Sequence, residues 1–274
     1  MISSKKYIMC HHLHDNKKFL KVKGSVSKSI FKNIVNKNKD KYIFTFDDGL
    51  KSQIIAAEFL EKHKLKGIFF INTFQFSKNL NLNEVCKHFI KKYFKSYDDF
   101  YFFFISNLKK RVLVKLSEIK NFSNIYPFYS RKEIIIRLIR NANAKIFNET
   151  LIKIFDKKKF KYKKKINEIY LNKKEIKKIS KKHQIGLHTH THPYNFDKLN
   201  NLKKVHEIKE NKKILEKIVG KKVSIFSYPC GKHSKDIISI LKKQKIYYAF
   251  NNKPIKYKNS RYLIPRTNII KFYK

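Results

Sequence analysis

The sequence predicts an α/β fold in which parallel strands form a barrel-like sheet, and three observations support this fold class. Short apolar runs alternate with segments in which apolar residues recur at helical spacing. The joints between these segments are short, as in parallel βαβ units. Polar groups directly follow several of the apolar runs. In a barrel of this kind, functional residues lie at the carboxyl ends of the strands.

The amino-terminal third is predicted to contain repeated βα units. The expected strands are apolar, β-branched or aromatic runs at 6–10, 42–46 and 67–72. The expected helices cover 25–35, beginning near Ser25 or Ser27, and 53–62. The strand at 42–46 runs straight into Asp47-Asp48-Gly49, which is typical of a tight turn.

The same alternation of helices and strands returns in the carboxyl-terminal hundred residues. Asn172 and Glu175 have the spacing of a capping box that opens a helix. The helices are expected at 173–182, 202–219 and 235–243, and Gly220 should end the second of them. The strands are expected at 184–187, 223–227, 247–250 and 263–266.

The middle of the chain, residues 74–169, has a different pattern. Long Lys-rich segments with helical periodicity, such as 85–94 and 132–142, replace the alternation, and they contain no cluster of chemical groups. Gly and Pro are scarce, with six and five residues, and no linker-like stretch separates independent domains. We therefore expect one domain over 1–274 with a largely helical insertion at 74–169.

The formal net charge of +45 would by itself suggest a nucleic-acid partner. The 59 Lys and only six Arg are spread along the whole chain among many Ile, Asn, Phe and Tyr residues. A general compositional bias explains this better than a nucleic-acid reader, which would concentrate Arg on one element. We expect no specific nucleic acid, but attraction to phosphate-bearing glycans or peripheral contact with an anionic membrane.

The cysteines and the amino terminus bear on the compartment. Cys10, Cys86 and Cys230 are odd in number and widely spaced, which favours a reducing compartment over a disulfide framework. The amino terminus lacks the apolar core of a secretory signal, and no stretch approaches the roughly 18 apolar residues of a membrane span. We expect a cytoplasmic protein, with the inner face of the membrane as one place of action.

Groups that bind metal ions follow two of the predicted strands. Asp47 and Asp48 follow the strand at 42–46, and His188 and His192 follow the strand at 184–187. Because the carboxyl ends of parallel strands share one face, these groups are expected to meet in space. Two imidazoles and one carboxylate can hold a divalent ion and leave positions for water and substrate. The sequence therefore predicts a hydrolytic metal site.

The motifs resemble those of the polysaccharide deacetylases, the NodB-like family also called carbohydrate esterase family 4. The run 45–49 (TFDDG) matches the first motif and 186–193 (GLHTHTHP) matches the second. The run 226–231 (FSYPCG) is similar to the F-x-Y-P-x-G motif of one branch, Cys10-His11 to its Tyr-His motif, and 264–266 (IPR) to its late Pro-Arg. The resemblance covers about 1–73 and 170–270, and it implies a distorted (β/α) barrel.

The resemblance also implies roles for individual residues. Asp48, His188 and His192 would hold the metal, for which zinc is the first choice and cobalt, nickel or iron are alternatives. Asp47 would be the general base. The backbone N–H of Cys230 would stabilise the oxyanion. Ser227 stands where many members have an Arg that contacts the base, and Arg266 would supply that contact. After His233 the chain has no histidine, so His11 is the candidate general acid, with His12 second.

The implied activity is hydrolysis of an acetyl group from a sugar, with N-acetyl favoured over O-acetyl. The substrate would be a cell-surface glycan or its nucleotide- or lipid-linked precursor. Two alternatives come from other classes: a catalytically inactive glycan-binding protein of the same fold, and a basic nucleic-acid-binding protein. Absence of bound metal would favour the first, and affinity for duplex DNA with a steep salt dependence would favour the second.

Overall fold

The computed structural model describes residues 6–78, 80–108, 114, 116–125, 129–252 and 260–273. The chain divides into two compact units, one formed by Met1–Asn79 with Asn167–Lys274 and the other by Leu80–Ile166. The second unit lies within the range 74–169. That this range is an insertion into a single domain stays a prediction.

The first unit is built on a seven-stranded sheet with the strand order β8-β7-β6-β5-β4-β1-β9. Every neighbouring pair in it is parallel. The strands are β1 (Lys6–Cys10), β4 (Tyr42–Phe46), β5 (Ile68–Ile71), β6 (Gln184–Leu187), β7 (Ile225–Ser227), β8 (Tyr248–Phe250) and β9 (Thr267–Asn268). Two further strands, β2 (Leu13–His14) and β3 (Val26–Ser27), form a small parallel sheet.

The segment 264–268 brings the two edges of the large sheet together. Ile264 forms a parallel bridge with Phe250 of β8 at one edge. Three residues later, Thr267 pairs with Ile8 of β1 near the other edge. The sheet therefore curls into a distorted barrel, and the predicted fold class is confirmed. The last strand lies later than the expected 263–266, which contains Pro265, a residue with no N–H to donate to a ladder.

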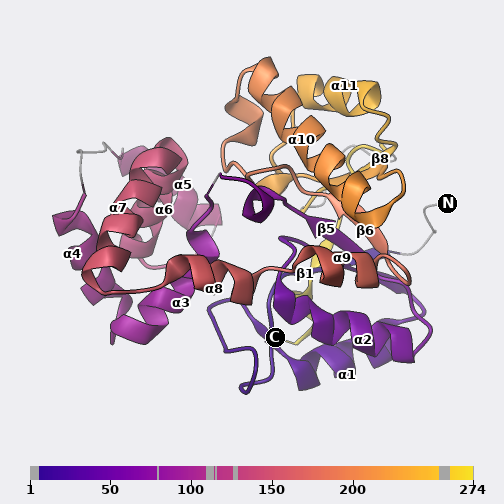
Figure 1. Cartoon of the computed structure of the whole chain (residues 1–274), viewed down its shortest axis with the longest axis horizontal. Helices are drawn as coiled ribbons and strands as arrows, with labels where there is room; N and C mark the ends of the chain where they lie inside the picture. Colours follow the sequence, from indigo (N-terminus) through magenta and orange to yellow (C-terminus); the bar gives the residue numbers. More distant parts are fainter. Residues whose placement is uncertain are drawn as a thin grey trace. The chain divides into compact units, whose positions relative to one another are not determined.

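Helices surround the curled sheet (Figure 1). They are α1 (Lys28–Asn38), α2 (Ile54–Lys62), α9 (Lys173–Ile179), α10 (Asn201–Val219) and α11 (Lys235–Lys243), with short 3-10 turns η1 (Lys51–Gln53), η2 (Phe74–Phe76), η3 (Phe196–Lys198), η4 (Pro229–Gly231) and η5 (Ile269–Phe272). Local chemistry sets their ends: the Ser27 side chain caps α1, and Asn172 and Glu175 form the expected capping box of α9. Gly220, at φ 73°, ends α10 in the left-handed conformation.

The sheet buries apolar side chains on both faces, and alternation along the strands separates the two sets. On the barrel interior, a small cluster joins Tyr7, Ile68, Phe70, Ile225 and Phe250. On the outer face, strand residues such as Phe46, Phe69, Ile71 and Leu187 pack with the helices in the main core. Side chains that follow the strands on the interior face therefore converge at one mouth of the barrel.

Gly186 in β6 leaves room for the ring of Phe70 inside the barrel. A Cβ atom at this position would lie 2.4 and 2.5 Å from two carbons of that ring. We expect Gly186→Ala to lower the free energy of unfolding by about 1–3 kcal/mol, because the interior is overpacked. Urea denaturation measures this, and the double variant Gly186→Ala/Phe70→Leu should recover part of the loss. A loss below about 0.5 kcal/mol would contradict the close contact.

The second unit is helical in its described part. Its helices are α3 (Asn83–Tyr93), α4 (Tyr97–Ser106), α5 (Leu116–Ile125), α6 (Arg131–Ala142) and α7 (Ala144–Lys157), and α8 (Tyr162–Ile169) runs across the boundary between the units. Buried aromatic rings give it a core of its own; Phe89 and Phe155, for example, lie 4.8 Å apart between ring centroids. This unit can therefore bury a core independently of the barrel.

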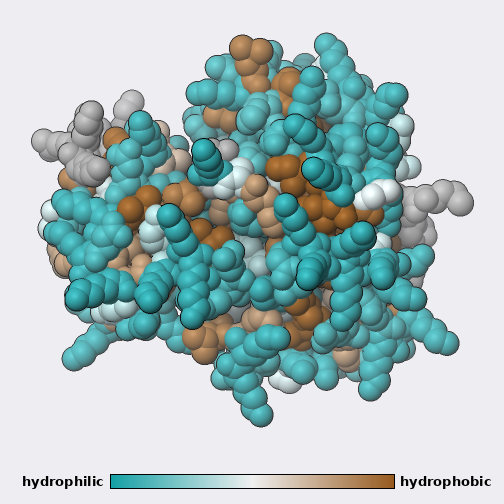
Figure 2. All heavy atoms as spheres, in the orientation of Figure 1, coloured by the Kyte–Doolittle hydropathy of each residue, from teal (hydrophilic) through white to brown (hydrophobic). Residues whose placement is uncertain are grey.

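Hydrophilic side chains cover most of the face seen in Figure 2, with smaller apolar patches between them. This agrees with the spread of the 59 Lys residues along the chain. Among the described residues, no helix is both long and apolar enough to cross a bilayer.

Candidate metal centre

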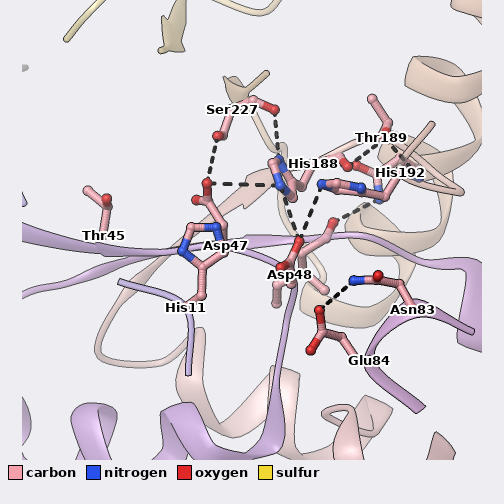
Figure 3. Close-up of polar contacts among 12 residues, drawn as sticks. His11, Thr45, Asp47, Asp48, Asn83, Glu84, His188, Thr189, His192 and Ser227 are labelled. Carbon is pink, nitrogen blue, oxygen red and sulfur yellow. Dashed lines mark hydrogen bonds and ion pairs between the residues drawn. The ribbon is translucent and has the colours of Figure 1, made fainter. Parts of the chain in front are cut away.

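Asp48, His188 and His192 lie together at the mouth of the barrel, and Figure 3 shows both imidazoles directed at the carboxylate. Oδ1 of Asp48 is 3.4 Å from Nε2 of His188 and 3.5 Å from Nε2 of His192. The three ligand atoms lie within 4.8 Å of one another. Ligand bonds of about 2.1 Å in a tetrahedral zinc site place neighbouring ligand atoms about 3.4 Å apart. The spacing of this trio fits a single small divalent ion.

The tautomer of His188 also fits a metal ligand. Its Nδ1 lies 2.8 Å from the carbonyl oxygen of Ser227, which can only accept, so Nδ1 carries the proton and donates. The opposite nitrogen, Nε2, is buried and has no hydrogen-bond partner among the described residues. An imidazole held by a carbonyl at Nδ1 with a free lone pair at Nε2 is the usual arrangement of a metal-binding histidine.

The backbone around the trio adopts conformations that non-glycine residues rarely adopt. Asp48, Thr189 and His192 have φ of 76°, 62° and 55°. The Thr189 hydroxyl donates to the His188 carbonyl at 2.6 Å and accepts from the N–H of His192 at 3.2 Å, which links the two histidines. Strained backbone that local bonds hold in place is typical of functional sites.

Asp47 lies beside the trio and is held by Arg266, the residue directly before β9. The two guanidinium nitrogens donate to the two carboxylate oxygens, each at 2.7 Å. Ser227 also donates to Oδ2 at 3.2 Å, and Arg266 donates to Ser227 and Thr45. Asp47 and Arg266 are each only 2% exposed. The structure thus places Arg266 against the carboxylate where the sequence resemblance expected it, and Ser227 joins the same network.

This arrangement keeps Asp47 ionised. Burial alone would raise the pKa of Asp47, but the positive charge of Arg266, the neighbouring His188 and the hydrogen bonds from Arg266 lower it to about 2. Burial likewise opposes the charge on Asp48, and the contacts with His188 and His192 hold the pKa of Asp48 well below its usual range. Two carboxylates are therefore charged side by side, which favours a cation at this position.

The candidate acids come from the end of β1. Cys10 pairs with Phe46 in the sheet, so His11 follows β1 where Asp47 follows β4, and Figure 3 shows the His11 ring beside Asp47. Burial lowers the pKa of His11, while the charges of Asp48 and Asp47 act in the opposite direction. His12 is buried, and its carbonyl accepts from the N–H of Val26. Their roles as proton donors stay predictions.

Cys230 lies in the turn η4, directly after β7. Its φ is 54°, and Gly231 follows at 68°. A Cβ atom on Gly231 would lie 1.9 Å from Oδ1 of Asn252, so a glycine is required there. The turn is thus tightly defined, and the role of the Cys230 N–H as an oxyanion donor stays a prediction.

Comparison with known proteins bears on the family and on the fold. Residues 141–249 match the family model described as polysaccharide deacetylase. The resemblance to the polysaccharide deacetylases is confirmed. The matched segment contains His188, His192 and Cys230, whereas the acidic pair and Arg266 lie outside it. No curated protein matches the sequence significantly.

Solved deacetylase structures share the fold. The chain resembles the deacetylase PplD of Streptococcus pyogenes, solved with acetate, with a TM-score of 0.55 and 12% identity over 96% of this chain and 91% of that one. It resembles IcaB of Ammonifex degensii with a TM-score of 0.52 and 11% identity over 97% and 92%. It resembles a de-N-acetylase of Aggregatibacter actinomycetemcomitans with a TM-score of 0.53 and 12% identity over 96% of this chain and 93% of that one. At such low identities, these matches establish the fold alone.

His190 lies between the two ligand candidates in the sequence, and its side chain faces the other way. Its Nδ1 is 2.8 Å from the Thr73 hydroxyl, and its backbone N–H donates to the carbonyl of Glu207 at 3.0 Å. Glu207 in turn accepts from both the N–H and the hydroxyl of Thr191. Helix α10 therefore holds the histidine loop from the outer face of the sheet.

Asn211, also in α10, is one of the supporting residues that the sequence analysis did not predict. It is fully buried; its Oδ1 accepts from the N–H of His188 at 2.9 Å, and its Nδ2 donates to the Ile71 carbonyl at 2.9 Å and to Thr73 at 3.1 Å. The sequence held one signal. Asn211 occupies the buried stripe of α10, where Ile208 and Leu215 precede and follow it.

We expect Asn211→Leu to weaken zinc binding about 10- to 100-fold, because the backbone of His188 loses the bond that positions it. Competition with a chromogenic chelator measures the affinity. Asn201→Leu, on the exposed start of the same helix, should leave it unchanged. Equal affinities in the wild type and the Asn211 variant would show that this bond does not position the ligand.

Proposed function

We propose that this protein is a metal-dependent hydrolase that removes an acetyl group, N-acetyl in preference to O-acetyl, from a sugar. One observation carries the proposal: an unpartnered, buried Nε2 of His188 and the ring of His192 lie at chelating distance from Asp48, directly beside a second carboxylate. On a fold shared with solved deacetylases, this arrangement of side chains is typical of a hydrolase that uses a metal ion and a separate general base.

A bound divalent ion would supply Lewis acidity toward the acetyl carbonyl and lower the pKa of water. Asp47, kept ionised and immobile by Arg266, accepts a proton from the attacking water as the new C–O bond forms. The N–H of Cys230 donates to the oxyanion of the tetrahedral intermediate. The C–N bond then breaks, and His11 gives the leaving nitrogen its proton, so that acetate and a free amine result.

The pKa of His11 bears on its role as acid. Burial lowers the pKa, which makes the imidazolium a stronger proton donor but leaves a smaller fraction of it protonated at neutral pH. The charges of Asp48 and Asp47 favour its protonated form and offset part of that effect. Its position after β1, with the ring beside Asp47, makes His11 our candidate for the proton donor.

The charge of the chain guides the choice of substrate. A net charge of +45 attracts anionic ligands over long range at low ionic strength. Acetylated sugars that carry phosphate, such as nucleotide- or lipid-linked glycan precursors, fit this better than neutral sugars. Such substrates are made inside the cell or at the inner face of its membrane, where we place the activity.

The test is acetate release from acetylated amino sugars, with and without a linked diphosphate, by protein loaded with zinc, cobalt or nickel. We expect release that stops when a chelator removes the metal and returns when metal is restored. The Asp48→Asn variant is the inactive control. The proposal fails if no acetylated amino sugar releases acetate above that control.

A further inference from the structure

Asn72 follows β5 and faces the barrel interior. Phe70, two residues earlier, belongs to the interior cluster, and Ile71 belongs to the outer core. Thr73 bonds His190 and Asn211 on the outer side. Because side chains alternate along an extended chain, Asn72 shares the inward face of Phe70, where Asp47 and His188 also lie.

Asn72 also lies at the level of the ligand trio. Ile71 pairs with Leu187 in the sheet, so Asn72 and His188 are the next residues on adjacent strands. The segments that follow β5 and β6 stay side by side beyond the sheet, since the N–H of Thr73 donates to the carbonyl of His190 at 3.1 Å. The amide of Asn72 is therefore a neighbour of a candidate metal ligand at the mouth of the barrel.

The carbonyl oxygen of this amide lacks the hydrogen bond that a buried acceptor normally accepts. Asn72 is 2% exposed, and its Oδ1 has no hydrogen-bond partner among the described residues. A buried carbonyl without a partner costs folding free energy, so each such group in a native protein calls for an explanation, of which a functional role is one. A carbonyl oxygen only accepts, so its partner is either a hydrogen-bond donor or a cation.

N-acetylated and O-acetylated sugars differ in whether they present such a hydrogen-bond donor. An acetamido group presents an N–H beside the carbonyl carbon that is attacked, and an acetyl ester presents an oxygen there with no proton. We infer that Asn72 accepts a hydrogen bond from the amide N–H of an N-acetylated sugar and thereby selects amides over esters. This inference rests on the proposed deacetylase function and names the substrate class of the same site.

The test uses two substrates that differ in one atom group, methyl 2-acetamido-2-deoxyglucoside and methyl 2-O-acetylglucoside. In Asn72→Leu, the substrate N–H loses its partner inside a buried site. We expect kcat/KM for the amide to fall about 10- to 100-fold and that for the ester to change less than about threefold. An equal fall on both substrates would overturn the inference.

Further measurements separate substrate binding from other roles of Asn72. Because the substitution removes an unpaired buried carbonyl, the variant should have an equal or higher Tm, and it should bind zinc like the wild type. Asn107→Leu, the same change at a buried asparagine of the second unit, should not alter the ratio of amide to ester activity. Weaker zinc binding in Asn72→Leu would assign Asn72 to the metal instead and overturn the inference.

A binding readout keeps this inference distinct from the proposed function. Metal-free wild-type protein should bind N-acetylglucosamine oligomers about 3- to 10-fold more tightly than metal-free Asn72→Leu, measured by titration calorimetry. If this difference appears but no substrate releases acetate, the proposed function fails and amide recognition by Asn72 stands. If acetate is released but neither the affinity nor the amide rate depends on Asn72, the inference alone fails.

Discussion

Replacing Arg266 with Met is expected to lower the free energy of unfolding by about 3–5 kcal/mol, because it leaves the buried carboxylate of Asp47 without its partner. Arg266 is buried, donates to both oxygens of Asp47, and also bonds Ser227, Thr45 and the carbonyl of Asn251. Urea denaturation of metal-free protein measures the change. The same variant should lose most acetate release, since Asp47 is no longer held in place.

A double variant identifies the cause of the loss. In Arg266→Met combined with Asp47→Leu, both charges are absent, so the cost should be well below that of Arg266→Met alone. Arg266→Lys should lie in between, because an ammonium keeps the charge and loses the paired geometry. If Arg266→Met costs less than about 1 kcal/mol, the ion pair does not hold the end of the barrel.

The same pair gives the wild type a pH dependence of a definite sign. The pKa of Asp47 falls from its usual 3.8 to about 2 on folding. The ionised carboxylate therefore contributes about 2 kcal/mol to the free energy of unfolding, and this contribution is complete above pH 3.8. That contribution is lost as the pH falls through about 2. The Arg266→Met variant should lack this part of the acid destabilisation.

The sequence allowed the ligand trio to be predicted because its members stand next to recognisable apolar strands. Asp48 and His188 each follow a buried run by one or two residues, and parallel strands bring such positions to one mouth. The unbroken motifs around them fixed which residues mattered. The contact from Arg266 came from family resemblance alone, since nothing local indicates where an arginine after a proline will lie.

The supporting residues could not be predicted in the same way. Glu207 reads as a polar residue of a solvated helix. The apolar stripe of α10 indicates that Asn211 is buried, but only the packing against the sheet shows which groups it bonds. In the described part of the chain, the barrel closes through the bridge at Ile264 and a two-residue strand, and both are too short to give a periodic signal. Asn72 read as the last residue of a strand, and its missing partner is visible only in three dimensions.

The metal site itself is tested most directly by Asp48→Asn, which should weaken zinc binding by more than about 100-fold. The variant loses the charged ligand, and Asn tolerates the left-handed φ of 76° at this position, so the backbone turn is preserved. Zinc at 100 times the wild-type Kd should stabilise the wild type by about 2.7 kcal/mol against unfolding and the variant by less than about 0.4 kcal/mol. Asp156→Asn, an exposed carboxylate in α7, is the matched control and should bind zinc like the wild type. If Asp48→Asn bound zinc with wild-type affinity, the two imidazoles and this carboxylate would not share an ion. The proposed roles of Asp47 as base and of the protein as a deacetylase would then be contradicted.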